Sequence, residues 1–334
     1  MSILSAILGD DFLDKTPGQY AGGVILNILG YNIFRTVYLN LGRLSPKRNV
    51  RKEFLPYLET MEKDGIVIIP DFLPADKFAE LRKEFDDLYS DWSPEQYNPE
   101  DFTKRQKDFP DYFKTIAEKI ITPNTPAFTN YFMKSDLINE LTSAVVNRQI
   151  RITPHHHFWY LKRRTLDKEG DKSFHSAGYP HQDVSYPTIK VFLYMNDVEE
   201  KNAAYIFAKG THKMSLRRLW LEYKLSVRFA KDNNDVATTD KDIEYLGSKS
   251  ESICGKANTL IISNNMGYHN RGNFTSLDPR QTAQLDFRNL DSWRNTLYRN
   301  DGAFISKITR RLVKSLDKAK KEKIRASLSN NNMS

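Results

Sequence analysis

The chain has 334 residues and 40% of them are hydrophobic, which suffices for a substantial core in one large or two ordinary domains. A single cysteine, Cys254, excludes an intramolecular disulfide framework and a cysteine-rich metal site, and it fits a reducing, cytoplasmic compartment. The net charge of +8 requires no nucleic-acid partner, because residues 307–325 hold nine Lys/Arg against two Asp/Glu and account for most of the excess.

Residues 1–52 predict a helical extension ahead of the main domain. Acidic residues stand where a signal peptide would be basic, so no signal peptide is expected. Residues 24–41 are largely apolar but contain three Asn and one Arg, which argues against a single membrane span. Two interpretations stay open. One is a helix pair buried on the main domain, and the other is a membrane-surface or substrate-access element within residues 18–45.

Residues 53–146 predict several helices around one short strand. The strand covers residues 66–69, after the turn formed by Asp64 and Gly65. The helices are indicated by apolar residues at helical spacing and by Pro and Asp at a helix start. They are expected over 53–61, from Pro74 onward, over 112–121 and over 131–146.

A strand is expected over residues 150–161, which include three consecutive histidines. Only alternate members of such a run share one face of a strand, and no carboxylate stands beside them. We therefore expect these histidines to be structural or solvated. If the strand continues, Tyr160, Lys162 and Arg164 lie on one face and are candidates for binding an anionic substrate or cosubstrate.

His181 and Asp183 carry the chemistry of the next stretch. Two residues apart on an extended strand, they point to the same face. One imidazole and one carboxylate are two-thirds of the donor set that holds non-haem iron and leaves positions open for O₂ and substrate. Alone, the motif is weak, since strands often carry it by chance. Further strands are expected over 188–196 and 203–208.

Residues 215–250 form a long insertion between the two halves of the expected β core. Apolar residues keep helical spacing in its first part, which predicts a helix over residues 215–230. Two roles stay open for this helix. It packs on the outside of the core, or it is a lid at the mouth of a barrel with Trp220 or Tyr223 facing the substrate.

The last β segment brings a third candidate ligand. A short apolar strand over residues 260–262 leads into a turn that delivers His269, and a return strand begins near Arg280. An arginine placed close to such a site suits a dicarboxylate, because a guanidinium binds a carboxylate through two parallel hydrogen bonds. His212 follows Gly210 in a turn, and we expect it to be structural.

Taken together, these segments resemble the phytanoyl-CoA dioxygenase family of Fe(II)/2-oxoglutarate-dependent oxygenases. The resemblance runs from about residue 62 to residue 288. The motifs that carry it are Asp64-Gly65-Ile66-Val67-Ile68-Ile69, His181-x-Asp183, Lys209-Gly210-Thr211-His212-Lys213, and His269 followed eleven positions later by Arg280.

The resemblance implies a mostly β core with flanking helices (α+β), built as a double-stranded β-helix of the jelly-roll or cupin-like kind. It implies that His181, Asp183 and His269 bind Fe(II), that Arg280 binds the distal carboxylate of 2-oxoglutarate, and that O₂ is the oxidant. The oxygenase domain is then expected over residues 53–300, with a basic C-terminal helix and flexible tail over 301–334.

The same resemblance implies oxidation of a C–H bond. Related halogenases have a small residue in place of the carboxylate of Asp183, so hydroxylation, desaturation or oxidative cyclisation is expected here. The basic residues Lys162 and Arg164 favour, as the substrate, a small carboxylate-bearing metabolite of specialised metabolism. The candidate substrate contacts are Tyr160, Lys162, Arg164, Trp220, Tyr223 and Arg271.

Two alternatives stay open for the function. One is hydroxylation of a fatty acyl-CoA or lipid at a membrane surface, with contact through residues 18–45 or 307–325. The other is a non-catalytic binding protein on the same barrel, although such a protein would be free to lose the three ligands and the arginine.

Overall fold

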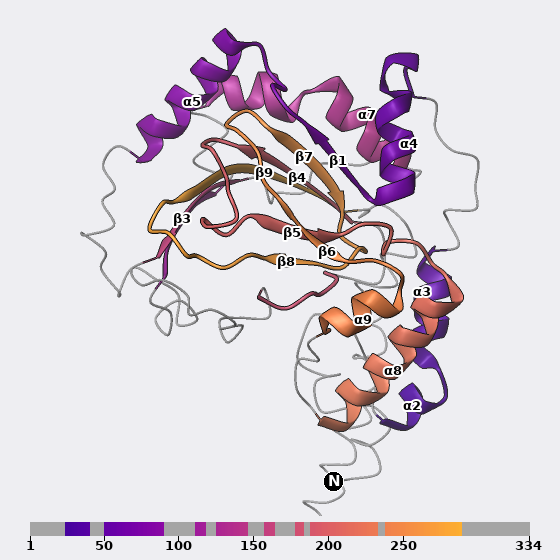
Figure 1. The fold of residues 1–334 in the computed structure, drawn as a ribbon. Coiled ribbons are helices and arrows are strands. Elements are labelled where there is room, and N and C mark those ends of the chain that lie inside the picture. Colours follow the sequence, from indigo (N-terminus) through magenta and orange to yellow (C-terminus); the bar gives the residue numbers. More distant parts are fainter. Residues whose placement is uncertain are drawn as a thin grey trace, which may run out of the picture.

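Six antiparallel strands form the larger of two sheets in the computed structural model (Figure 1). The model describes residues 24–40, 50–89, 111–117, 125–145, 157–163, 178–183, 188–232 and 238–288. The strands of the larger sheet, in spatial order, are β1 (Ile66–Ile69), β7 (Leu260–Asn264), β4 (Thr188–Tyr194), β9 (Arg280–Arg288), β3 (His157–Arg163) and β2 (Asp111–Ala117).

The smaller sheet has three antiparallel strands, with β5 at its centre. These strands are β6 (Ser250–Ile253), β5 (Tyr205–Ala208) and β8 (His269–Arg271). Strand β8 follows β7 after a turn of four residues, so the chain passes directly from the larger sheet to the smaller one. Apolar side chains of both sheets pack together in one buried cluster, which includes Ile66, Tyr194, Phe207 and Ile261.

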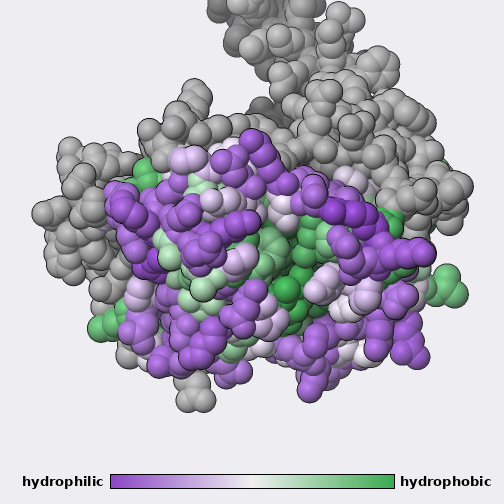
Figure 2. Space-filling view, turned by 90° about the horizontal axis from the view of Figure 1, so that it is seen from above, coloured by the Kyte–Doolittle hydropathy of each residue, from purple (hydrophilic) through white to green (hydrophobic). Residues whose placement is uncertain are grey.

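Helices cover one face of the larger sheet (Figure 1). The covering helices are the 3₁₀ helix η3 (Lys52–Phe54), α4 (Leu55–Asp64), α5 (Ala75–Tyr89), the π-helix η6 (Phe128–Met133) and α7 (Asp136–Val145). Helix α4 ends at Gly65, whose φ of +79° lets the chain turn directly into β1. Seen from this side, the surface is mostly hydrophilic, with hydrophobic residues gathered near its centre (Figure 2).

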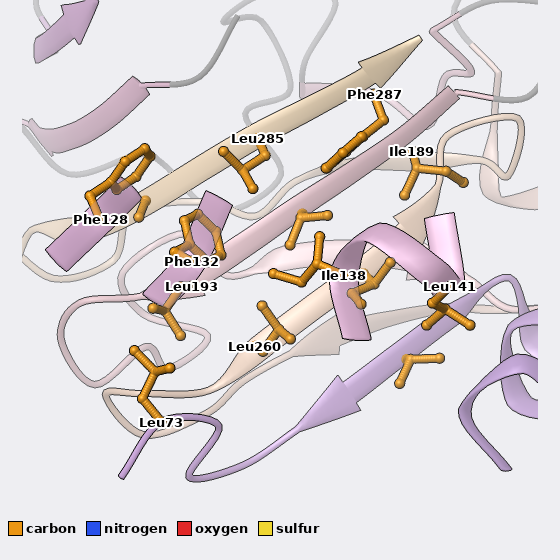
Figure 3. Packing of buried hydrophobic residues seen from close by; sticks show 14 of the residues in the cluster. Leu73, Phe128, Phe132, Ile138, Leu141, Ile189, Leu193, Leu260, Leu285 and Phe287 are labelled. Atoms are coloured by element: carbon orange, nitrogen blue, oxygen red, sulfur yellow. The ribbon is translucent and has the colours of Figure 1, made fainter. Parts of the chain in front are cut away.

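The main hydrophobic core lies between these helices and the larger sheet (Figure 3). Successive side chains of a strand point to opposite faces, and β4 follows this rule. Ile189, Val191 and Leu193 point into the core, and Phe128, Phe132, Ile138 and Leu141 of the helices pack in the same cluster. The other face of β4 is left for Lys190, Phe192 and Tyr194.

A second group of helices lies beside the smaller sheet: α8 (Leu216–Asp232), α9 (Asp240–Tyr245), α2 (Val24–Ile28) and α3 (Tyr31–Asn40) (Figure 1). The expected helices over 24–41 and 215–230 are thus observed. The hydroxyl of Tyr223 on α8 donates a hydrogen bond of 3.1 Å to the carbonyl of Ile28. In the described part of the chain, no helix has both the length and the apolar character that a membrane span requires.

One element differs in type from the sequence prediction. A helix was expected over residues 112–121, but residues 111–117 form strand β2, which pairs along its whole length with β3. The segment contains the aromatic residues Tyr112 and Phe113 and the β-branched residues Thr115 and Ile116, which favour a strand where a neighbouring strand is present to pair with. The expected C-terminal helix and tail, 301–334, lie outside the described residues.

Candidate metal centre

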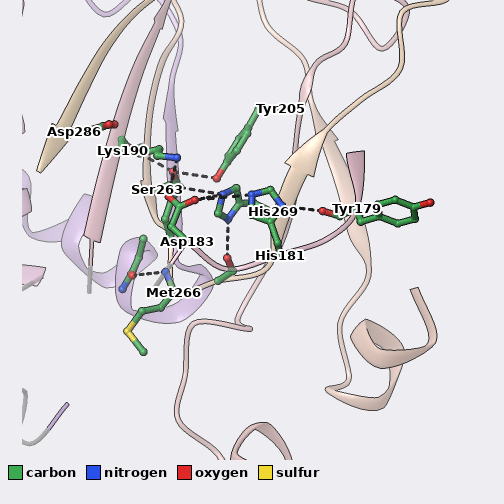
Figure 4. A network of polar contacts seen from close by, with 12 residues as sticks. Tyr179, His181, Asp183, Lys190, Tyr205, Ser263, Met266, His269 and Asp286 are labelled. Atoms are coloured by element: carbon green, nitrogen blue, oxygen red, sulfur yellow. Dashed lines mark hydrogen bonds and ion pairs between the residues drawn. The ribbon is translucent and has the colours of Figure 1, made fainter. Parts of the chain in front are cut away.

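Three side chains converge at the junction between the two sheets (Figure 4). The ligand atoms of His181, Asp183 and His269 all lie within 4.8 Å of one another. Oδ1 of Asp183 is 3.4 Å from Nε2 of His269 and 3.9 Å from Nε2 of His181. Within the ranges that the structure describes, this is the one such group of three metal-ligating residues.

The backbone brings the two histidines together. The amide of His181 donates to the carbonyl of His269, and the amide of His269 donates back, each at 2.9 Å. This reciprocal pair is an antiparallel bridge that joins the segment 178–183 to β8. It places the two imidazole rings on the same side, with their centroids 4.6 Å apart.

Both imidazoles are oriented by backbone carbonyls. Nδ1 of His181 lies 2.8 Å from the carbonyl of Tyr179, and Nδ1 of His269 lies 2.9 Å from that of Gly267. Each contact assigns the proton to Nδ1 and leaves Nε2 as the atom with a lone pair, which is how metal-binding histidines are usually held. Burial, together with the nearby His269, lowers the pKa of His181 from 6.5 to about 4, so its imidazole is neutral near pH 7.

The two oxygens of Asp183 have different surroundings. Oδ1 faces the histidines, whereas Oδ2 contacts Nζ of Lys190 at 2.7 Å and accepts a 2.9 Å hydrogen bond from Nδ2 of Asn265. Burial raises the pKa of the Asp183 carboxyl, but Lys190 and the histidines outweigh it and hold that pKa well below its usual range. The donor set of one carboxylate and two imidazoles, all converging, fits a divalent iron ion.

Arg280 begins β9, is half-buried and lies near Arg271 and Tyr194. One of its terminal nitrogens donates to the carbonyl of Ala203. Burial lowers the pKa of its guanidinium to about 10, with opposing contributions from Tyr194, which raises it, and Arg271, which lowers it. Among the described residues, no carboxylate lies within ion-pairing distance of Arg280. It shares one face of β9 with Asp286, and Asp286 stands opposite Lys190 in the sheet.

The other expected substrate contacts fall into two groups. The side chains of Tyr160 and Lys162, and all of Arg164, lie outside the described part of the structure. Arg271 is two residues beyond His269 on β8, and its guanidinium carbon is 5.8 Å from the centroid of Phe274.

Helix α8 contacts the two segments that carry the metal ligands, residues 181–183 and 266–269, but Trp220 and Tyr223 do not take part in these contacts. They stack on each other with ring centroids 5.4 Å apart, and Tyr223 bonds to α2. The side chain of Trp220 is 53% exposed. At 100° per residue, Trp220 lies almost opposite Arg218, which does reach these segments. The described contacts of Trp220 and Tyr223 therefore include none with the segments that carry the metal ligands. The face of α8 that contacts those segments is the one that carries Arg218 and Glu222.

Four residues of this region were not singled out in the sequence. Lys190 carries a usable signal, since it is the one charged residue of strand β4. Arg218 and Glu222 carry no such signal, because an Arg and a Glu four positions apart are typical of a solvent-exposed helix face. Asn265 directly follows two other polar residues, Ser263 and Asn264, and cannot be distinguished from them by sequence.

The chain was compared with known proteins. The family model described as "Phytanoyl-CoA dioxygenase (PhyH)" matches residues 61–241, more than half of the chain. The chain belongs to the phytanoyl-CoA dioxygenase family. The matched range includes His181 and Asp183 and ends before His269. No curated protein matches the sequence significantly.

Several solved structures are similar to this member of the phytanoyl-CoA dioxygenase family. AviO1 from Streptomyces viridochromogenes Tue57 is 10% identical, with a TM-score of 0.45, over 73% of this chain and 98% of that one. EctD from S. alaskensis, with 2-oxoglutarate and 5-hydroxyectoine, is 15% identical, with a TM-score of 0.46, over 73% and 81%. HygX from Streptomyces hygroscopicus, with nickel and 2-oxoglutarate, is 13% identical, with a TM-score of 0.44, over 72% and 87%.

Membership of the phytanoyl-CoA dioxygenase family establishes the class of protein. It is an enzyme, a non-haem dioxygenase that uses Fe(II), 2-oxoglutarate and O₂. The family assignment rests on the family model, and the presence of a His-Asp-His group in the structure agrees with it.

Proposed function

We propose that His181, Asp183 and His269 bind Fe(II), and that the enzyme oxidises a C–H bond of a small carboxylate-bearing metabolite. The observation that carries the proposal is the convergence of the three ligand atoms within 4.8 Å, with Nδ1 of each histidine held by a backbone carbonyl. The chemistry that bound Fe(II) and 2-oxoglutarate supply is oxidation of the C–H bond by O₂, coupled to conversion of 2-oxoglutarate to succinate and CO₂.

Several residues of the site would orient the three metal ligands. The carbonyls of Tyr179 and Gly267 hold the imidazoles in the tautomer that binds metal. Lys190 and Asn265 hold Oδ2 of Asp183, so Oδ1 is the oxygen directed at the ion. Two imidazoles and one carboxylate would hold Fe(II) and leave room for 2-oxoglutarate and O₂.

Arg280 is proposed to bind the distal carboxylate of 2-oxoglutarate. A half-buried guanidinium that has no carboxylate partner among the described residues favours the binding of an anion. A 2-oxoglutarate carboxylate would supply that anion and accept two hydrogen bonds at once. The location of Arg280 on the same face of β9 as Asp286, which stands opposite Lys190, supports this role.

A carboxylate-bearing substrate is supported by the charge of the same region. Arg271 follows the ligand His269 on β8, and Lys190 contacts the ligand Asp183. Guanidinium and ammonium groups close to a metal centre favour anionic ligands there. The reaction type among hydroxylation, desaturation and oxidative cyclisation follows from the substrate and is part of the same proposal.

A lipid or fatty acyl substrate is the second candidate. Large apolar side chains stand exposed on the helices beside the smaller sheet: Leu216 of α8 is 86% exposed, Leu29 beside α2 is 77% exposed and Phe34 of α3 is 69% exposed. Basic residues Arg217, Lys224 and Arg228 accompany them on α8. Apolar and basic residues together suit the surface of an anionic bilayer.

The two sheets are proposed to be the halves of a double-stranded β-helix. Two features support this reading: both sheets are antiparallel, and the chain passes from β7 of the larger sheet into β8 of the smaller one through a single short turn. The proposed metal ligands lie where the segment 178–183 bridges to β8 of the smaller sheet.

The substrate class is tested by oxygen-dependent succinate formation with two pools of compounds. One pool holds small amino and carboxylic acids, and the other holds fatty acyl-CoA and lipid species in vesicles. We expect turnover, with succinate and oxidised product in equal amounts, from the first pool. Turnover from the second pool alone would overturn the carboxylate-metabolite proposal in favour of the lipid candidate, with the enzyme class unchanged.

A further inference from the structure

The side of the histidine bridge that faces away from the metal site is occupied by two other residues. Gln182 lies between His181 and Asp183, and Tyr268 immediately precedes His269. Both are buried. Alternation along an extended chain directs their side chains away from the imidazoles, on the opposite side of the bridge. Any group that holds Gln182 and Tyr268 together therefore acts on both ligand-bearing segments.

An ion pair on α8 is that group. Nε of Arg218 lies 2.8 Å from Oε1 of Glu222, and the side chains of both residues are 1% exposed. The carboxylate of Glu222 accepts hydrogen bonds from Nε2 of Gln182, at 2.8 Å, and from the hydroxyl of Tyr268, at 2.9 Å. Thus one carboxylate bonds to both segments.

The guanidinium of Arg218, like the carboxylate of Glu222, contacts both ligand-bearing segments. It donates to Oε1 of Gln182 at 2.6 Å and to the carbonyl of Met266 at 3.0 Å, and its carbon lies 3.9 Å from the centroid of the Tyr268 ring. A third bond, of 2.8 Å, reaches the carbonyl of Thr211. The hydroxyl of Thr211 in turn accepts from the amide of Tyr268 at 2.9 Å.

The amide of Gln182 makes this contact specific. Its oxygen faces Arg218 and its nitrogen faces Glu222. A reversed amide would set an N–H against the guanidinium and an oxygen against the carboxylate. A shift of the segment would leave buried charged groups without partners, which costs several kcal/mol in general. The ion pair therefore permits one position of residues 181–183 relative to residues 266–269.

We infer that Arg218 and Glu222 are positioning residues of the metal centre, which hold the two ligand-bearing segments at the separation that the metal requires. The inference rests on the proposed function, in that His181, Asp183 and His269 are taken as the ligands. It assigns a task to the insertion that differs from a lid: α8 supports the ligands from behind.

Binding of Co(II), a spectroscopic substitute for Fe(II), tests this inference without turnover. Gln182→Met removes the link to one ligand segment and keeps the ion pair, whereas Glu222→Gln removes the charge and keeps the shape. Loss of groups that support metal ligands typically weakens binding roughly 10- to 100-fold. We expect a rise of that size in the Co(II) dissociation constant of both variants, with an altered visible spectrum.

Leu225→Ala is the matched control. Leu225 is buried on the same helix in an apolar cluster with Leu221, Ile243 and Tyr268, so its truncation weakens the attachment of α8 and removes none of the polar contacts of Gln182, Glu222 and Tyr268. Urea unfolding of the metal-free proteins measures the stability lost in each variant. We expect Leu225→Ala to lose stability and still bind Co(II) as the wild type does.

Three outcomes separate the possibilities. If Leu225→Ala weakens Co(II) binding as much as Gln182→Met does, general packing of α8 explains the effect and the positioning role is wrong. Wild-type affinity in both Gln182→Met and Glu222→Gln also overturns the inference and leaves the proposed function intact. A wild-type protein that binds Co(II) no better than His269→Ala overturns the metal site itself, and this inference with it.

Discussion

The two sides of the larger sheet are stabilised in different ways. On the helix-covered side, the buried cluster consists of apolar side chains such as Phe85, Phe132 and Leu193. On the other side, a smaller apolar cluster that includes Tyr194 and Ile261 is accompanied by charged and amide groups that contact one another, of which Arg218, Glu222 and Gln182 are buried and Asp183 and Lys190 are half-buried. The proposed metal ligands belong entirely to this polar side.

The difference has an energetic meaning. Burial of one large apolar side chain contributes roughly 1.5–3 kcal/mol and requires no particular partner. A buried charge contributes little or nothing net, and it costs several kcal/mol when its partner is removed. The apolar side thus supplies stability, while the polar side fixes which atoms meet. Changes on the two sides should therefore affect different measurements.

The largest effect is expected on the polar side, at a ligand. His269→Ala removes one of three donor atoms, and we expect stoichiometric Fe(II) binding and 2-oxoglutarate turnover to be lost. The variant should still be folded, which a cooperative unfolding transition in urea would show. Metal content after anaerobic loading and desalting measures the change. An equivalent of bound iron in His269→Ala would move attention to His212, which packs against Gly65 outside the group.

On the apolar side, Phe132→Ala is expected to cost about 3–5 kcal/mol of unfolding free energy. Phe132 is fully buried, and its ring centroid lies 5.3 Å from that of Phe128. Metal affinity of the folded protein should not change, which is the reverse of the result for His269. Phe132→Leu serves as the control, because it fills most of the volume. A loss of metal affinity in Phe132→Ala would show that the two sides are coupled.

Arg280→Ala is expected to weaken 2-oxoglutarate binding by on the order of 2–5 kcal/mol, because a buried charge-assisted pair is lost. Iron affinity should stay at the wild-type value, which separates Arg280 from the ligands. Anaerobic titration of the Fe(II) protein with 2-oxoglutarate, followed through the charge-transfer absorption of the bound cosubstrate, gives the first result, and metal content after anaerobic loading and desalting gives the second. Arg280→Lys keeps the charge but cannot form two parallel hydrogen bonds, so its affinity for 2-oxoglutarate should lie between those of the wild type and Arg280→Ala. Equal affinity in all three proteins would remove Arg280 from the site.

The smallest effect is expected from a pair of glycines. Gly65 and Gly247 have nearly the same backbone conformation, with φ of +79° and +78°. An alanine there costs roughly 1–2 kcal/mol for conformation alone. An added Cβ at Gly247 meets nothing within 4 Å, whereas at Gly65 it overlaps the His212 ring. Gly65→Ala should therefore lose more unfolding free energy than Gly247→Ala, and equal losses would show that the His212 ring moves aside freely.

The sequence predicted the elements whose pattern is local. Strand 66–69, the helix after Pro74 and the strand near 260 are observed, because turn residues and apolar periodicity mark them. Residues 111–117 were assigned the wrong type, since their conformation depends on pairing with β3. A mostly β core with flanking helices was expected, and two antiparallel sheets with flanking helices are observed.

The candidate site was predictable to a similar degree. The types and spacing of His181, Asp183 and His269 indicated three ligands, and the structure places them together. Arg218 and Glu222 could not be found in this way, because the same pair of residues on a helix surface is common and only burial distinguishes it. The apolar stripe that drew attention to Trp220 and Tyr223 belongs to the face that meets α2.

The pairing of β1 with β7 has a consequence for synthesis of the chain. Ile66 pairs with Ser263, so the edge strand β1 cannot form its pair with β7 until the ribosome has synthesised the chain beyond Ser263. Contacts between such distant residues slow folding and leave apolar strands uncovered in the meantime. His269 follows β7 by only a few residues. The three proposed ligands therefore come together at about the time the sheet closes, and metal cannot act as an early template for folding.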